Sequence, residues 1–524
     1  MGDEEIRMEE KSLKSSVVSG LFWKFAESIC ADLVSFIVSI ILARLLLPSD
    51  YGEIALVNVF IVIANVFVVN GLGSALIQKK DADALDFSSV FYANLGFSIF
   101  LYLIIFFSSP LVAGFYGIPH LSVVLRVLGI RIPLAAILSI QNAYVSRKMI
   151  FRKFFFATII GTVISAVVGI YMAYNGYGVW ALVAQILTNT VIDSLMLTIL
   201  TRWIPKLQFS FQRLKGLIKY GWKILASSLI KTGYNQLSSL IVGKKYTKED
   251  LAFYTKGKQY PELIVTNIDS SINSVLFPAI SKRQTDIEKV KSMTRRSMKT
   301  STYIMCPLLF GLAAISAPLI SLMLTDKWLF CVPYLKICCF YYVMQPVSTA
   351  NLQAIKAIGR SDVILKLDII KRGAGLAFLL SLMWFGPIYV ALAPVGMTIV
   401  ATIVNAIANK KLINYKYKEQ VMDLFPIFSL ALVMFGVVYG LSLLFSSLGL
   451  ANVFIVIIGV CVGGLVYLIL SLIFKVDSFR YILNSLKGFF KKTSKKEKLQ
   501  ENTDTTADNT NDMDAEDTQE KTDD

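Results

Sequence analysis

Residues 450–474 read LANVFIVIIGVCVGGLVYLILSLIF and contain no charged side chain. An apolar run of about 20 residues is long enough to cross the hydrocarbon core of a bilayer as an α-helix. Six further runs also lack charge: Ile54–Ile77, Phe87–Ala113, Phe154–Tyr174, Thr300–Thr325, Gly386–Ala408 and Leu424–Leu448. Seven more are as long and apolar but carry charges: Ser16–Ala43, Leu121–Val145, Tyr177–Leu200, Tyr220–Val242, Gln259–Ser281, Trp328–Ile355 and Asp362–Phe385. The sequence therefore predicts an all-α integral membrane protein with about 14 transmembrane helices.

The composition is typical of a membrane protein and excludes several soluble classes. Apolar residues make up 55% of the 524 positions, charged residues 17%, and the mean hydropathy is +0.62. Soluble domains carry about 25% charged residues. A formal net charge of +16 in so apolar a chain indicates cations confined largely to short loops at a membrane. These values exclude a disordered regulator, a disulfide-rich secreted module and a soluble DNA-binding domain, so we expect no nucleic-acid partner.

Six cysteines and one histidine restrict the chemistry further. The cysteines lie within apolar segments and none has CxxC spacing, which favours buried packing over a zinc or redox site; they are Cys30, Cys306, Cys331, Cys338, Cys339 and Cys461. His120 stands beside Pro119 in an expected outer loop. We therefore expect no catalytic residue, no metal and no cofactor.

The distribution of Lys and Arg orients the chain in a bacterial plasma membrane. If residues 1–15 are cytoplasmic, the six inner linkers hold 24 Lys and Arg and the seven outer linkers hold 7. Five of those seven lie in Gly243–Lys258, the longest outer linker. Because cations are retained on the cytoplasmic side during insertion, both termini are predicted to be cytoplasmic.

Short matches at similar offsets indicate an internal duplication. At offsets of 199, 200 and 213, the matched pairs are Trp23 with Trp222, Arg44–Asp50 with Lys244–Asp250, and Pro133 and Arg147 with Pro346 and Arg360. Six helices return the chain to its starting side, so the two repeats are expected to be parallel. We predict an N-lobe at 16–200 and a C-lobe at 220–413, joined by a cytoplasmic linker at 201–219 and followed by two helices within 424–474.

The carboxyl end differs from the rest of the chain. Residues 479–498 intersperse aromatic and aliphatic side chains with lysines, which predicts a basic amphipathic helix on an anionic inner leaflet. Residues 500–524 contain ten acidic residues, one lysine and no aromatic residue, which predicts an acidic disordered tail. This tail contributes a net charge of −9, so residues 1–499 carry +25.

Ionisable side chains within the expected spans are numerous, although each costs about 2.5–3.5 kcal/mol at mid-bilayer. Together with Lys256 and Lys258 just ahead of the eighth span, eleven cations stand against seven carboxylates. This surplus predicts a central cationic cavity between the lobes that attracts an anion such as phosphate or pyrophosphate. The side chains that we expect to bind the anionic headgroup are Lys24, Arg126, Arg131, Lys231, Lys371 and Arg372.

Alternatives stay open for many of these charges. The carboxylates either form ion pairs or bind H⁺ or Na⁺ during transport, and the candidates are Glu27, Asp32, Asp193, Asp269 and Asp368. Helical spacing places Lys24 and Glu27 on one face, and Asp368, Lys371 and Arg372 on another. Cations near span ends either line the cavity or extend to the interface; they are Lys223, Lys256, Lys258, Lys336 and Lys366.

Two motifs resemble a known family. The segment from Arg44 to Gly52, read as Arg-x-Leu-x-Pro-x-Asp-Tyr-Gly, and Leu276–Ser281 are similar to those of Wzx-type polysaccharide transporters in the multidrug/oligosaccharidyl-lipid/polysaccharide exporter superfamily. The resemblance covers roughly residues 12–475 and is greatest to the branch exporting lipopolysaccharide, colanic acid or teichuronic acid repeat units. It implies that the chain flips an undecaprenyl-pyrophosphate-linked oligosaccharide to the outer leaflet, driven by an ion gradient or the membrane potential.

Other functions are weighed against this expectation. A lipid II flippase is mechanistically close, whereas a multidrug extruder of the same superfamily favours cationic solutes. A membrane glycan polymerase or glycosyltransferase usually needs a sizeable outer loop, and the expected outer loops here are short. The expected partners are the lipid-linked substrate and membrane lipids, and a polysaccharide polymerase and glycosyltransferases are further candidates.

Overall fold

The computed structural model describes residues 2–69, 72–79 and 81–484, and every regular element in these ranges is a helix. The N-lobe contains α1 (Gly2–Leu45), α2 (Pro48–Val69), α3 (Leu72–Gln78), α4 (Ala84–Tyr116), α5 (Leu121–Gly129), α6 (Arg131–Lys148), α7 (Phe151–Tyr174) and α8 (Val179–Thr201). The C-lobe contains α9 (Phe211–Lys245), α10 (Lys248–Ser281), α11 (Ile287–Ala314), α12 (Ser316–Leu324), the 3₁₀ helix η1 (Asp326–Cys331), α13 (Val332–Tyr342), α14 (Gln345–Ala357), α15 (Ser361–Leu382) and α16 (Pro387–Ile413). Helices α17 (Tyr417–Ser447) and α18 (Asn452–Ile473) follow.

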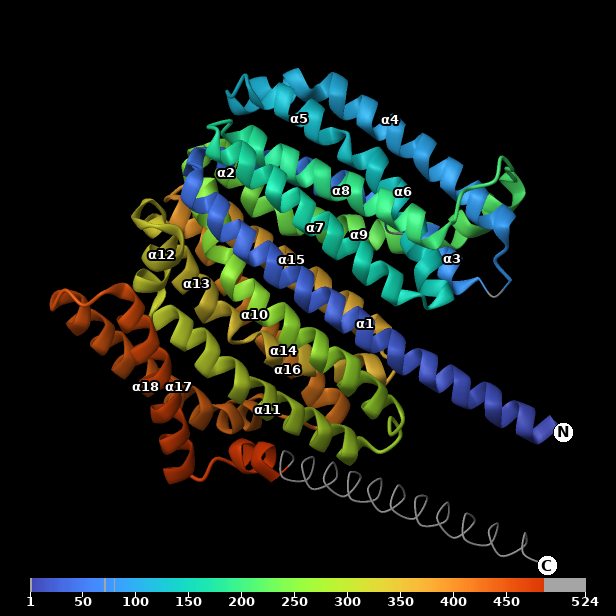
Figure 1. Cartoon of the computed structure of the whole chain (residues 1–524). Helices are drawn as coiled ribbons and strands as arrows, with labels where there is room; N and C mark the ends of the chain where they lie inside the picture. Colours follow the sequence, from blue (N-terminus) through green and yellow to red (C-terminus); the bar gives the residue numbers. More distant parts are fainter. Residues whose placement is uncertain (1, 70–71, 80, 485–524) are drawn as a thin grey trace, which may run out of the picture.

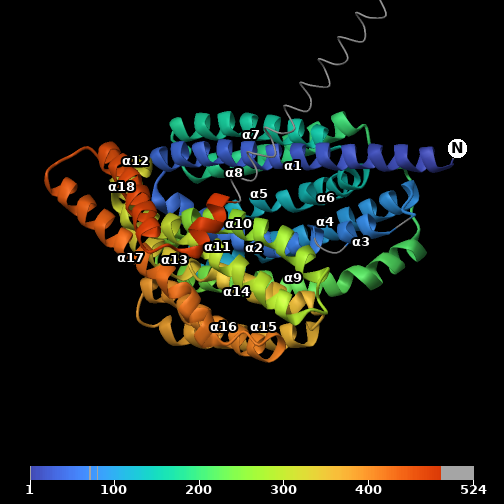
Figure 2. The same cartoon turned by 90° about the horizontal axis from the view of Figure 1, so that it is seen from below.

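The helices form two bundles with an added pair at one edge (Figure 1). In Figure 2, α1 and α7 lie on the side opposite α15 and α16, while α17 and α18 extend beyond one end. Helix α17 packs on α11 and on α18, so the added pair is attached to the C-lobe. Residues 477–484 are helical, whereas the rest of the predicted amphipathic helix and the whole acidic tail lie outside the described residues.

Eleven helices of the described residues are long and apolar enough to cross a membrane, or twelve if the bent pair α11 and α12 counts as one span. Two predicted spans, α9 and α15, fall outside this count. Helix α9 carries Lys215, Lys231 and Lys244 among its cations, and α15 carries Asp368 and Arg372 among its charges. These charges lower the hydropathy of otherwise long helices, and the count of 14 stays a prediction.

Breaks in the helices recur at the offsets found in the sequence. Helix α1 ends and α2 begins around Leu46–Leu47, and α9 and α10 meet at Tyr246–Thr247, 200 residues later. The residues that follow α5 and α13 as their carboxyl-terminal caps are Ile130 and Val343, at an offset of 213. Pro133 and Pro346 each stand in the first turn after such a break, where a missing N–H costs no helical hydrogen bond. The two repeats therefore share their interruptions as well as their sequence matches.

The predicted outer linker Gly243–Lys258 is wrong. Helix α9 continues to Lys245, and α10 begins at Lys248. The Thr247 side chain accepts a hydrogen bond from the Asp250 N–H at 3.1 Å, and the Asp250 carboxylate accepts one from the Thr247 N–H at 3.2 Å. This capping box starts the helix more than two turns before Gln259. The charges that ended the span in the sequence are therefore part of the helices.

Buried apolar side chains form one large cluster on each side of the molecule. The larger cluster draws mainly on α10–α18 and includes the fully buried Trp328. The second draws mainly on α1–α8 but also contains Val242, Leu251 and Tyr254 from the start of the C-lobe. The lobes are thus joined around the turn between α9 and α10, which is where the principal polar cavity begins.

Candidate functional site

A polar cavity of about 690 Å³ lies between the lobes. Helices α1, α2 and α8 line it from the N-lobe, and α9 and α10 line it from the C-lobe. Its uncharged polar side chains include Ser39, Asn58, Gln185, Gln236 and Gln259. Amides and hydroxyls both donate and accept hydrogen bonds, so this lining suits a hydroxyl-rich molecule.

Helix α10 supplies a stripe of polar residues along the cavity. Thr255, Lys256, Gln259, Glu262 and Thr266 all line it, and from Lys256 onward they follow at spacings of three and four residues. Residues at this spacing lie on one face of an α-helix. The stripe therefore presents the Lys256 ammonium near the start of α10 and the Glu262 carboxylate about two turns further along the helix.

Lys256 is the one cation in this lining, and it is buried with 5% exposure. Its ammonium donates to the Ser39 hydroxyl at 2.9 Å and stands 4.5 Å from the centre of the Tyr51 ring. None of the ion pairs formed within residues 2–69, 72–79 and 81–484 includes Lys256. A hydroxyl and an aromatic face compensate only part of the cost of burying an ammonium. An anion entering the cavity would supply the missing charge.

The Arg44–Gly52 motif forms part of the cavity wall beside Lys256. Pro48 begins α2, and the Asp50 carboxylate accepts a hydrogen bond from the Leu47 N–H at 3.0 Å. Tyr51 supplies the ring beside Lys256. A Cβ added to Gly52 would stand 1.8 Å from the Lys248 carbonyl oxygen. The glycine is required because α2 and the start of α10 approach backbone to backbone.

Two corners between long helices cross between the lobes; we call residues 44–52 the first corner and residues 244–252 the second corner. The Arg44 guanidinium donates to the Met323 carbonyl at 2.7 Å and also to the Leu322 carbonyl, both at the end of α12. The Lys244 ammonium donates to the Phe115 carbonyl at the end of α4. Each corner thus places a cation on the carboxyl end of a helix in the opposite lobe, where the helix dipole favours positive charge.

A second cavity, of about 1130 Å³, lies between α1, α10 and α11. Its wall contains large apolar side chains, among them Ile29, Leu33, Phe36, Leu276 and Ile304. Asp32, Leu263 and Asn267 line both this apolar cavity and the polar one. The two spaces therefore adjoin, one suited to hydrocarbon and the other to a polar headgroup.

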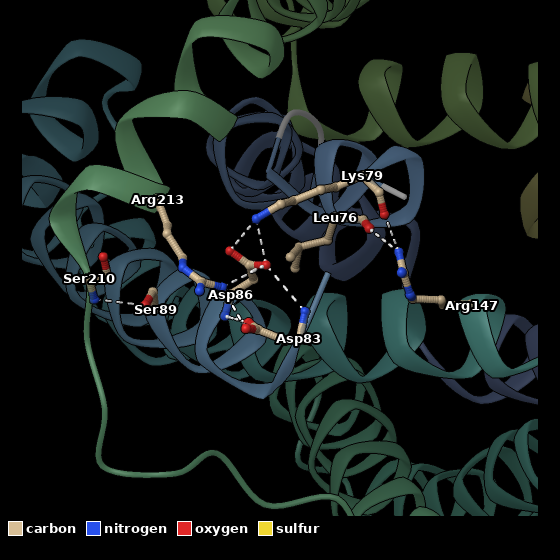
Figure 3. Close-up of polar contacts among 8 residues, drawn as sticks. All are labelled: Leu76, Lys79, Asp83, Asp86, Ser89, Arg147, Ser210 and Arg213. Atoms are coloured by element: carbon tan, nitrogen blue, oxygen red, sulfur yellow. Dashed lines mark hydrogen bonds and ion pairs between the residues drawn. The ribbon is translucent and has the colours of Figure 1, made fainter. Parts of the chain in front are cut away.

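The linker between the lobes is held by a polar cluster at the predicted cytoplasmic face (Figure 3). Arg213 at the start of α9 donates to Asp83 at 2.6 Å, and the buried Asp86 forms an ion pair with Lys79 at 2.6 Å. The hydrogen bond from the Asp86 N–H, reinforced by the Arg213 guanidinium, lowers the pKa of Asp83 to about 2. The Ser210 N–H donates to the Ser89 hydroxyl at 2.9 Å. The amino-terminal end of α9 is therefore anchored on the N-lobe.

A family model described as "Polysaccharide biosynthesis protein" matches residues 41–333, which is more than half of the chain. The chain belongs to this family. The match includes both corners and the Lys256 stripe, and thus most of the residues that line the polar cavity.

Curated relatives and solved structures extend the same result to most of the chain. The teichuronic acid biosynthesis protein TuaB of Bacillus subtilis is 22% identical over 470 residues, which is 88% of this chain and 96% of TuaB. The lipopolysaccharide biosynthesis protein WzxC of Escherichia coli is 22% identical over 445 residues, covering 83% and 89%. The succinoglycan biosynthesis transport protein ExoT of Rhizobium meliloti is 25% identical over 333 residues, covering 63% and 67%.

Among solved structures, the lipid II flippase MurJ in an inward closed conformation has a TM-score of 0.70 at 16% identity, over 88% of this chain and 100% of MurJ. An inward-facing multidrug resistance MATE family transporter has a TM-score of 0.56 at 16% identity, over 73% and 94%. These matches confirm the predicted resemblance and the all-α membrane transporter fold. This member of the polysaccharide biosynthesis family is thus a multi-pass membrane protein.

The cations that the sequence assigned to the anionic headgroup lie outside both cavity linings described above, and their role stays a prediction. Lys24 pairs with Glu27 at 2.7 Å and faces Phe154, and Lys371 pairs with Asp368 at 2.9 Å. Arg126 donates to the Ser109 hydroxyl at 2.8 Å, between α5 and α4. The remaining three are Arg131, which is half-buried at the start of α6, Lys231, which is exposed on α9, and Arg372, which lies over the Tyr234 ring.

The polar lining consequently differs from the cationic cavity that was predicted. It contains two carboxylates, Asp32 and Glu262, against the single ammonium of Lys256. The sequence-based surplus counted every cation within the spans, and several of these side chains have partners within their own lobe: Lys24 pairs with Glu27, Arg126 contacts Ser109, and Lys371 pairs with Asp368. Pairing within a lobe, as between Lys24 and Glu27, removes charge from the cavity without leaving it unpaired.

The five carboxylate candidates lie in different places. Asp32 alone reaches both cavities, while Asp269 accepts hydrogen bonds from Gln345 at 2.9 Å and Thr349 at 3.1 Å within the C-lobe. The Glu27 carboxylate is buried, and Asp193 packs on Gly161 with one buried oxygen that has no hydrogen-bond partner among the described residues. Asp368 is joined to Lys371. The structure thus brings Glu27 and Asp193 together in the N-lobe, close enough to interact electrostatically.

Lys256 is the residue that sequence reasoning left out of the site. It was placed at a span end, where extension to the interface was an equal alternative, because α10 was expected to begin at Gln259. Two signals were available: the Thr247–Asp250 capping box and the polar stripe from Thr255 to Thr266. Together they would have placed Lys256 inside a helix and on its polar face.

Proposed function

We propose that this protein flips an undecaprenyl-pyrophosphate-linked oligosaccharide repeat unit from the inner to the outer leaflet of the bacterial plasma membrane. The observation that carries the proposal is the buried Lys256 ammonium, which stands without a carboxylate partner at the end of the polar cavity. Phosphate oxygens are strong partners for such a cation. The membership of the polysaccharide biosynthesis family supports a saccharide cargo over other anions.

The two adjoining cavities match the three parts of such a substrate. The polar cavity offers amides and hydroxyls to the sugars and Lys256 to the pyrophosphate. The apolar cavity offers aliphatic and aromatic side chains to the isoprenoid chain. Residues Asp32, Leu263 and Asn267 lie where these cavities meet. A lipid-linked headgroup held at this junction would keep its chain on the apolar side throughout its passage.

Alternating access would then require the two corners to separate. They close the space above Lys256, and both are held by hydrogen bonds that cross between the lobes. Because Arg44 and Lys244 bind exposed helix ends, these bonds exchange for water when the lobes move apart. With the termini placed in the cytoplasm, the closed corners lie on the outer side.

The energy source is proposed to be an ion gradient or the membrane potential. Glu27 and Asp193 are the favoured coupling groups, because their neighbouring carboxylates share a buried region of the N-lobe. The buried Asp193 oxygen that has no hydrogen-bond partner among the described residues leaves a place for a proton or a cation. The expected readout is loss of export in Asp193→Asn with unchanged binding of lipid-linked substrate.

The proposed function is tested by Lys256→Gln in a strain that depends on this protein for surface polysaccharide. We expect export to fall at least about tenfold, with the lipid-linked repeat unit accumulating on the inner leaflet. Lys256→Arg should retain part of the activity, since it keeps the charge. Lys282→Gln is the matched control, because Lys282 is exposed at the end of α10 and lines neither the polar nor the apolar cavity.

Stability separates a loss of function from a loss of folding in this experiment. Replacing an uncompensated buried ammonium by an amide should leave thermal stability unchanged or raise it. Normal export by Lys256→Gln at normal expression would refute the role of this residue. Rescue of a strain lacking its lipid II flippase would favour that alternative, and export of cationic drugs would favour a multidrug transporter.

A further inference from the structure

A third cavity lies where the start of α11 meets the segment after α18. Its volume is about 310 Å³, and its charged lining consists of Arg295, Arg296, Lys299 and the single carboxylate Asp477. It is thus strongly cationic, unlike the polar cavity between the lobes. The topology predicted from Lys and Arg places this end of α11 on the cytoplasmic side.

The three cations differ in whether they already have a carboxylate partner. Arg295 forms a two-point ion pair with Asp423, with Nε to Oδ2 at 2.6 Å. Lys299 binds the exposed Asp477 carboxylate at 3.0 Å, which lowers the pKa of Asp477. Arg296 stands over the Tyr481 ring at 5.1 Å and takes part in no ion pair found in the described ranges. An anion arriving here would meet one free guanidinium and one ammonium held by an exchangeable partner.

This cationic cavity continues into the large apolar cavity. Arg296, Thr300 and Tyr481 line both of them. Two serines of the apolar wall are bonded to their own helix, since Ser270 and Ser271 on α10 donate to the Asn267 carbonyl. A molecule spanning both cavities would carry an anionic group at one end and a long hydrocarbon at the other.

We propose that this composite cavity is an entry site for a polyprenyl phosphate lipid of the inner leaflet. Its phosphate group binds Arg296 and takes the place of Asp477 on Lys299, while its chain lies along Leu33, Phe36 and Leu276. Charge complementarity selects the phosphate, and the apolar wall selects the chain. The inference rests on the proposed function and adds to it a first binding point, separate from Lys256.

The proposal is tested by binding of undecaprenyl phosphate to the purified full chain in detergent, measured by native mass spectrometry. Arg296→Gln should weaken binding about tenfold, and Arg296→Lys should recover part of the loss. Asp477→Asn should strengthen binding, because it removes the carboxylate that competes for Lys299. Arg283→Gln is the matched control, since Arg283 lies in the adjacent linker outside this cavity and should bind as the wild type does.

The competing ligands define the outcomes that would overturn the proposal. Inorganic phosphate and neutral undecaprenol should each fail to displace undecaprenyl phosphate at equal concentration. Displacement by inorganic phosphate would indicate an anion site without a lipid, and equal binding of phosphatidylglycerol would indicate a general lipid surface. Unchanged affinity in a folded Arg296→Gln would refute the site itself.

Failure of this proposal is distinguishable from failure of the proposed function. Lys256→Gln should keep wild-type affinity for undecaprenyl phosphate while losing export. If Lys256→Gln exports normally but Arg296→Gln loses binding, the entry site stands and the transport path is wrong. If Arg296→Gln binds normally but Lys256→Gln loses export, the transport path stands and the entry site is refuted.

Discussion

The first and second corners have nearly the same backbone and different side chains. Each joins two long helices at the same offset of 200 residues, and each uses an aspartate to cap the second helix. At the same offset, however, Leu56 of the N-lobe corresponds to Lys256 of the C-lobe, and both side chains are buried. The two corners therefore share a backbone frame, and the two lobes differ just beyond it, where a buried lysine stands in place of a buried leucine.

The largest expected effect breaks the contact between the corners. Gly52→Val places a side chain against the Lys248 backbone, where even a Cβ would stand 1.8 Å from the carbonyl oxygen. We expect a loss of about 3 kcal/mol or more, seen as a lower thermal denaturation temperature and reduced folded yield. Ala252→Gly at the equivalent position of the second corner is the control, and it should cost about 1 kcal/mol. Equal effects of the two variants would contradict the difference between the corners.

The second prediction concerns the hydrogen bonds that cross between the lobes. Arg44→Ala and Lys244→Ala should each favour the conformation with separated corners, and the double variant should exceed either one. Losing about 1 kcal/mol per contact raises that population roughly fivefold. Labelling of Ser39→Cys by an impermeant thiol reagent, in a background without the native cysteines, measures the opening. No increase in the double variant would show that these contacts do not hold the outer side closed.

The third prediction compares Arg147 and Arg360, which are equivalent at an offset of 213. Arg147 donates to the Leu76 carbonyl at 3.1 Å and to the Lys79 carbonyl at the end of α3 (Figure 3). Arg360 instead pairs with the exposed Asp362. Arg147→Ala should therefore cost about 1–2 kcal/mol, because buried carbonyls lose their donor. Arg360→Ala should cost less than about 0.5 kcal/mol. Thermal denaturation of the two variants decides the comparison, which would fail if Arg360→Ala were the more damaging.

The smallest expected effect is the pH dependence of stability at the Arg213–Asp83 contact, which anchors the start of α9 on the N-lobe. Asp83 has a pKa of about 2 in the folded protein and 3.8 as its ordinary value. Its contribution is present above pH 4 and is lost as the pH falls from about 4 to about 2, since the folded state must then bind a proton. Asp83→Asn should flatten the stability profile in this window and lower stability slightly at pH 7, where the contribution of the wild-type carboxylate is fully present. An unaltered acid profile would show that the Arg213 contact contributes nothing measurable.

The sequence predicted the helical class, most of the spans and the duplication, because these depend on apolar length and local pattern. The span at 259–281 was placed too late, since a run of lysines from Lys244 to Lys258 resembles a loop when charge alone is considered. The single helices expected at 121–145 and 328–355 are interrupted near Pro133 and Pro346. Hydropathy is insensitive to such interruptions, because the residues on both sides remain apolar.

The candidate site was predicted less well than the fold. Helical spacing correctly joined Lys24 with Glu27 and Lys371 with Asp368, since residues three apart share one face. It could not show which face points toward the opposite lobe, so paired cations were assigned to the cavity. Lys256 was passed over because its partners Ser39 and Tyr51 are more than 200 residues away in the chain.

What the sequence determined by itself is that this chain is a duplicated helical membrane protein with an excess of positive charge. Insertion into a bilayer depends on the length and polarity of each segment, and both can be read locally. Only the tertiary structure showed that one buried lysine faces the space between the lobes, that two matched corners close it, and that Arg296 borders the apolar cavity. These features depend on which helix faces meet, and that arrangement is set by packing between segments far apart in the chain.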